Sequence, residues 1–89
     1  MPSRIVEIGC KHGLHTHPAA LIAKAAEEAG IPVTIGRPGE TGVDATSMIM
    51  LVALGAEHGE KLEVVVGNAE NSEAILDEIV DILATDYDV

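Results

Sequence analysis

The stretch that decides the fold is residues 4–29, RIVEIGCKHGLHTHPAALIAKAAEEA, in which the spacing of apolar residues changes across a polar bend. Residues 4–8 combine β-branched side chains with partial alternation, which is typical of a strand. In residues 18–29 small and aliphatic side chains recur at helical spacing, and Gly30 supplies a stop signal. The stretch therefore predicts a strand, a polar loop over residues 9–17 and a helix.

The rest of the chain contains five further elements, indicated by apolar spacing and by glycine, proline or capping residues at their ends. They are strands at residues 31–35, around Val43 and at residues 61–66, and helices at residues 47–54 and 70–84. This order predicts an α+β fold, a two-layer open-faced sandwich with a four-stranded antiparallel sheet and three helices on one face. The acidic end from Asp86 to Val89 is expected to fray.

Length and composition restrict the class of protein. A chain of 89 residues, 47% of them hydrophobic, predicts one globular domain over residues 1–89. No apolar run approaches the roughly 20 residues that span a bilayer, and no secretory leader is visible, so a cytoplasmic location is expected. A single cysteine, Cys10, forms no internal disulfide. The net charge of −10 argues against nucleic-acid binding.

The bend at residues 13–19, GLHTHPA, is the candidate site because it sets His15 just before a helix start. Pro18 suits the first helical turn, where backbone N–H groups have no acceptor within the helix. Those N–H groups and the positive end of the helix dipole stabilise a nearby phosphate or carboxylate. A neutral imidazole nitrogen there is suited to attack a phosphoryl donor, which predicts phosphoryl transfer through a phosphohistidine.

Two motifs and the order of elements resemble those of the HPr family, the histidine-containing phosphocarriers of the phosphoenolpyruvate-dependent sugar phosphotransferase system. The matching segments are GLHT at residues 13–16, PAA at 18–20, SMIM at 47–50 and LG at 54–55. The resemblance covers essentially the whole chain. It implies a cytoplasmic, monomeric phosphoryl carrier that needs no cofactor and is not a stand-alone enzyme.

The resemblance also implies roles for particular residues and partners. Enzyme I would transfer a phosphoryl group from phosphoenolpyruvate to Nδ1 of His15, which would pass it to the A-domains of sugar permeases. Thr16 and His17, with the backbone N–H groups that follow, would stabilise the phosphate. Ser47 matches a regulatory serine that an HPr kinase/phosphorylase modifies in some lineages. The partner-docking residues implied by the family are Ala20, Met48, Ile49 and Leu51.

His17 departs from the family pattern, which has arginine two residues after the active histidine. Arginine offers a permanent charge and a planar fork of donors, whereas an ordinary imidazole is mostly neutral at pH 7. The substitution predicts a weaker or pH-sensitive hold on the phosphate. Lys11 and His12 are candidates to supply replacement charge.

Two alternatives use the same segment. Cys10, His12, His15 and His17 offer one sulfur and three imidazoles, a donor set that suits zinc or copper, although their spacing matches no structural zinc pattern. The other alternative is a regulatory interaction module that keeps the fold but has impaired phosphotransfer. His58, beside a glycine, is predicted to be plain turn surface.

Overall fold

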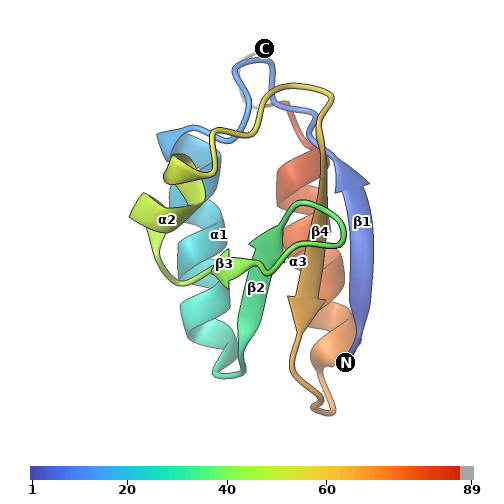
Figure 1. The fold of residues 1–89 in the computed structure, drawn as a ribbon. Coiled ribbons are helices and arrows are strands. Elements are labelled where there is room, and N and C mark those ends of the chain that lie inside the picture. The colour runs from blue at the N-terminus through green and yellow to red at the C-terminus, as the bar shows by residue number, and fades with distance from the viewer. Residues whose placement is uncertain (87–89) are drawn as a thin grey trace.

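The computed structural model describes residues 1–86 as an open-faced sandwich with the element order βαββαβα (Figure 1). The strands are β1 (Ser3–Glu7), β2 (Val33–Gly36), β3 (Val43–Asp44) and β4 (Lys61–Val66), and the helices are α1 (Thr16–Ala29), α2 (Met48–Ala53) and α3 (Ser72–Ala84). The predicted fold class is confirmed. The part of the tail at residues 87–89, where fraying is expected, lies outside the described residues.

The sheet is antiparallel throughout and has the strand order β1-β4-β2-β3. The last strand of the sequence therefore lies at the centre, between β1 and β2. Residues 37–42 connect β2 to β3 in a hairpin, in which Ile35 is opposite Val43. This central place explains why β4 contributes three fully buried side chains, from Leu62, Val64 and Val66.

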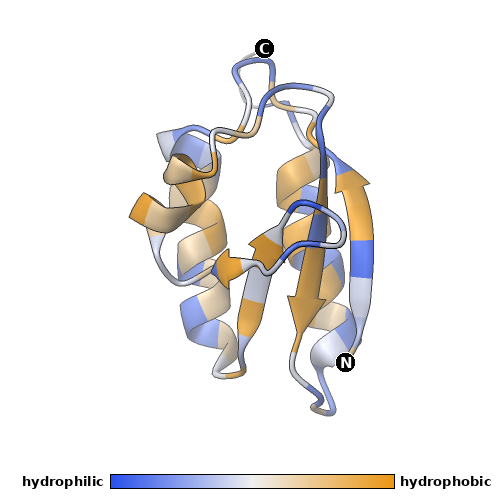
Figure 2. Cartoon of the chain, viewed as in Figure 1, coloured by the Kyte–Doolittle hydropathy of each residue, from blue (hydrophilic) through white to orange (hydrophobic). Residues whose placement is uncertain are grey.

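The core lies between the sheet and helices α1 and α3, which run side by side behind it (Figure 1). Helix α2 packs mainly on α1 and on β3. Figure 2 shows hydrophobic residues along β4 and also over α2. The largest fully buried side chains are those of Ile8, Pro18, Ile22, Val33, Ile35, Leu51, Leu62, Val64, Val66, Leu76, Ile79 and Leu83. None of the helices within residues 1–86 has the length and apolar character needed to cross a membrane.

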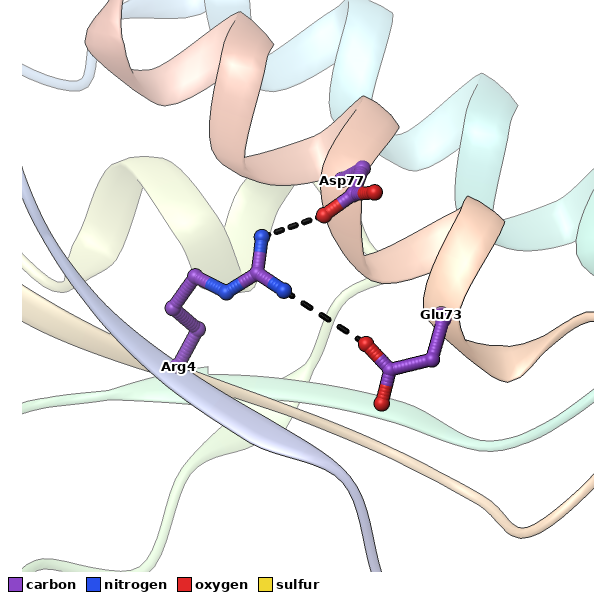
Figure 3. A network of polar contacts seen from close by, with 3 residues as sticks. All are labelled: Arg4, Glu73 and Asp77. Atoms are coloured by element: carbon purple, nitrogen blue, oxygen red, sulfur yellow. Dashed lines mark hydrogen bonds and ion pairs between the residues drawn. The ribbon is translucent and has the colours of Figure 1, made fainter.

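Arg4 ties the outer strand β1 to α3. Its guanidinium pairs with Asp77 and lies 3.4 Å from Oε2 of Glu73, one helical turn earlier (Figure 3). All three side chains are exposed, so solvent screening keeps the contribution of these pairs to stability small.

A half-buried ion pair joins the β2–β3 hairpin to the loop between α2 and β4. Arg37 pairs through Nε with Glu60 and donates from Nη2 to the carbonyl of Leu54 at 3.0 Å. The second carboxylate oxygen of Glu60 accepts the N–H of Glu57 at 2.9 Å. The hydrogen bond from Arg37, followed by that from Glu57, lowers the pKa of Glu60 below its usual range.

This pair predicts a pH-dependent loss of stability in Glu60→Gln. A carboxyl with a lowered folded-state pKa stabilises the fold above its unfolded pKa and loses that contribution as pH falls through the folded value. Thermal melts should therefore place the variant below the wild type at neutral pH, with the gap closing in acid. A gap that is constant with pH would contradict an electrostatic role for Glu60.

Candidate functional site

His15 immediately precedes helix α1, and its half-buried side chain lies at the N-terminus of that helix. Its backbone is extended (φ −98°, ψ −170°), and its carbonyl accepts the first helical hydrogen bond, from Ala19 at 3.0 Å. The helix begins at Thr16, two residues before the start predicted at Pro18. The prediction was late because proline is tolerated anywhere in the first turn, not only at its first position.

The loop from Gly9 to His15 is held by backbone hydrogen bonds to distant segments. The N–H of Gly9 donates to Leu83 and that of Leu14 donates to Ala56, at 2.9 and 3.0 Å. Gly13 has φ +75°, and a Cβ there would lie 2.3 Å from the carbonyl oxygen of Ala56. Only glycine permits both this backbone conformation and this close approach. The position of His15 therefore depends on the α2–β4 loop.

Two contacts of Cys10 in this loop were not predicted from the sequence. Nε2 of His15 lies 3.3 Å from Sγ of Cys10, whose side chain is buried. Nδ1 of His58 lies 3.2 Å from the carbonyl oxygen of Cys10. The prediction that His58 is plain turn surface was incomplete, because its exposed ring also contacts this loop. No sequence signal marks the contact, which joins residues 48 positions apart.

Thr16 and His17 occupy the first turn of α1 directly after His15, and both are exposed. The ring of His12 packs edge-on against that of His15, with centroids 6.2 Å apart. Lys11 is exposed in the same loop, and its backbone N–H donates to Asp86 at 3.3 Å. The helix N-terminus and these side chains make this end of the molecule suited to an anion.

The four side chains of the alternative metal site do not converge. Among residues 1–86 there is no group of three or more histidine, cysteine, aspartate or glutamate side chains arranged to hold a metal ion. The side chains of Cys10 and His15 are brought together. The ring of His58, which is outside this donor set, contacts the backbone carbonyl of Cys10 and not its sulfur. Metal binding through Cys10, His12, His15 and His17 therefore has no support in this fold.

Helix α2 presents an apolar surface beside α1. Met48, Ile49, Met50 and Val52 expose 39, 76, 47 and 37% of their area, and Leu21 of α1 exposes 36%. Ala20 is also exposed. The prediction of Leu51 as a docking residue is wrong, because Leu51 is fully buried. A six-residue helix that is apolar on every side gives no sign of which side faces inward, so Met50 and Val52 were missed.

Ser47 caps α2, as its position before the helix predicts. Its Oγ accepts the N–H of Met50 at 3.2 Å. Ser47→Ala should lower the free energy of unfolding by about 1 kcal/mol, because one N–H at the helix start loses its acceptor. Urea denaturation would measure this loss, and Ser47→Asp, which keeps an acceptor, is the matched control. Equal stability of Ser47→Ala and the wild type would contradict the capping role.

Comparison with known proteins adds an independent observation. Residues 2–85 match the family model for the PTS HPr component phosphorylation site. The chain belongs to the HPr family. It is 38% identical over 84 residues to the phosphocarrier protein HPr of Streptomyces coelicolor, covering 94% of this chain and 89% of that protein. It is 35% identical over 83 residues to HPr of Haloferax volcanii, covering 92% of each.

Solved HPr structures share the fold. The crystal structure of HPr from Bacillus anthracis superposes with a TM-score of 0.81 over 92% of this chain and 95% of that one, at 23% identity. At 23% identity the superposition shows that the two chains share the fold and no more than that. Family membership rests on the sequence matches and on the position of the GLHT motif at the start of α1.

Proposed function

We propose that this protein carries a phosphoryl group on His15, receiving it from Enzyme I and passing it to the A-domains of sugar permeases. The observation that carries the proposal is the position of His15 at the N-terminus of a 14-residue helix in a chain of the HPr family. First-turn N–H groups and the helix dipole stabilise the added phosphate, so the modified state forms in a favourable electrostatic environment. The family relationship also supports a cytoplasmic location.

The proposed reaction is a transfer and not a hydrolysis. A lone pair of the neutral imidazole attacks phosphorus, the bond from phosphorus to the donor breaks, and the donor keeps the electron pair. Passing the group to a second acceptor reverses these steps, with the imidazole as leaving group. In this role Thr16 and His17, in the first turn, stabilise the phosphate oxygens.

The exposed apolar side chains of α1 and α2 form the proposed docking surface for both partners. It consists of Ala20, Leu21, Met48, Ile49, Met50 and Val52. Ser47 lies at its edge, which supports the proposal that an HPr kinase/phosphorylase acts there. A phosphate would bring about −1.5 to −2 charges next to an apolar contact, which opposes docking.

The direct test is incubation of the protein with Enzyme I, magnesium and phosphoenolpyruvate, followed by phosphorus NMR. A new phosphohistidine resonance in near-stoichiometric amount is expected. Omission of Enzyme I is the control and should give no such signal. Absence of the signal in the complete mixture would overturn the proposal and favour a regulatory interaction module with impaired phosphotransfer.

His17 predicts a shorter-lived phosphohistidine than an arginine would give. In His17→Arg a permanent guanidinium can hold the phosphate oxygens in a bidentate manner at every pH. Hydrolysis of the isolated phosphoprotein should therefore be slower in the variant, and its rate should vary less between mildly acidic and mildly basic pH. Indistinguishable profiles would show that residue 17 does not contact the phosphate.

A further inference from the structure

The contact between Cys10 and His15 distinguishes the two ring nitrogens of the proposed phosphoryl acceptor. Nε2 lies 3.3 Å from Sγ of Cys10, and the Cys10 residue is only 1% exposed, so this edge of the ring faces a buried residue. A nitrogen that attacks phosphorus must direct its lone pair at an incoming group with open space in line. The sulfur occupies that position at Nε2, so Nε2 is hindered from attacking phosphorus.

The backbone of Cys10 is held firmly, so its sulfur has a defined place. Its carbonyl accepts the N–H of Gly13 at 2.9 Å and lies 3.2 Å from Nδ1 of His58. A carbonyl oxygen only accepts, so in this contact His58 is the donor and carries a proton on Nδ1. The neighbouring residue Gly9 is tied to Leu83 of α3. These hydrogen bonds hold the loop in place and so fix the position of the Cys10 thiol.

We propose that Cys10 is a positioning residue for phosphoryl transfer: its sulfur accepts the Nε2–H of His15, fixes the ring and keeps the lone pair on Nδ1. The proposal rests on the function proposed above. A neutral imidazole carries one ring proton, and the hydrogen bond made by one nitrogen decides which nitrogen holds it. With the proton on Nε2, Nδ1 is an acceptor and a nucleophile.

The same contact serves both halves of the transfer. When Nδ1 bonds to phosphorus and the donor departs with its electron pair, the ring becomes cationic and Nε2 keeps its proton. The hydrogen bond to sulfur then strengthens because its donor carries charge. When the phosphoryl group leaves, the N–P electron pair returns to Nδ1 and the ring is neutral again. No proton moves to or from Cys10 in either step.

The test measures the tautomer of His15 directly, by long-range proton–nitrogen NMR of the neutral ring in 15N-labelled protein without Enzyme I. The wild type should show predominantly the Nε2–H form. Cys10→Ala, which lacks an acceptor, should show a mixture of tautomers. Cys10→Ser, whose hydroxyl accepts, should restore the Nε2–H form. A wild type in the Nδ1–H form, or no change in Cys10→Ala, would overturn the proposal.

Phosphorylation by Enzyme I provides the second measurement. Cys10→Ala should accept the group about fivefold more slowly, the effect of losing one ordinary hydrogen bond, and Cys10→Ser should recover most of the rate. If Cys10→Ser is as slow as Cys10→Ala, the sulfur acts through packing and the proposal fails. If no protein, wild type included, accepts a phosphoryl group, the proposed function fails, whereas the tautomer spectra still decide whether Cys10 orients the ring. Amide spectra check that each variant is folded.

Discussion

His15→Ala should accept no phosphoryl group from Enzyme I, whereas the wild type should be labelled almost completely. The expected loss is total because the proposed reaction forms a bond to an imidazole nitrogen, and alanine offers no nucleophile. The side chain is half-buried and makes no capping hydrogen bond to α1, so the variant should remain folded. Acid-labile radioactivity after incubation with labelled phosphoenolpyruvate measures the result.

His58→Ala is the matched control for that experiment. It also removes one imidazole next to the same loop. Within residues 1–86, however, the only hydrogen bond of the His58 ring is to the backbone carbonyl of Cys10. The control should still acquire the label in full. Its labelling rate measures how much the hydrogen bond from His58 to the Cys10 carbonyl contributes to the reaction. Labelling of His15→Ala at the wild-type level would mean that another residue carries the group.

Gly13→Ala should be strongly destabilised and should also accept the phosphoryl group poorly. Two costs add at this position. A side chain at φ +75° is strained by about 1–2 kcal/mol. A Cβ located 2.3 Å from the Ala56 carbonyl must also displace backbone, which costs a further 1–3 kcal/mol or so. Because the Ala56 carbonyl accepts the N–H of Leu14, moving it also displaces His15.

Gly30→Ala separates the two costs. Gly30 ends α1 with φ +69°, close to the value at Gly13, yet a Cβ there would meet nothing within 4 Å. The control should lose only the conformational part, about 1–2 kcal/mol, and keep the wild-type phosphorylation rate. Urea denaturation of the two variants side by side measures the difference. Equal losses would show that the α2–β4 loop yields easily and does not position His15.

The motif that points to phosphoryl transfer is local, and for that reason it could be found in the sequence. Glycine, histidine and proline within seven residues predict a helix start with an imidazole beside it, since capping and proline preferences depend on neighbouring residues alone. The alternation in residues 61–66 likewise predicted β4 with its observed bounds. The error at Leu51 arose where such a signal is missing, on a short helix whose residues 48–53 are all apolar.

The sequence by itself determined which segments become strands and helices, the sandwich class and the identity of the proposed nucleophile, because these depend on periodicity and on nearest neighbours. Only the tertiary structure decided that β4 lies at the centre of the sheet, that Leu51 is buried, and that Cys10 faces Nε2 of His15. Those features depend on how separate elements pack and on the direction of side chains in an irregular loop. No repeating pattern in the chain encodes that direction.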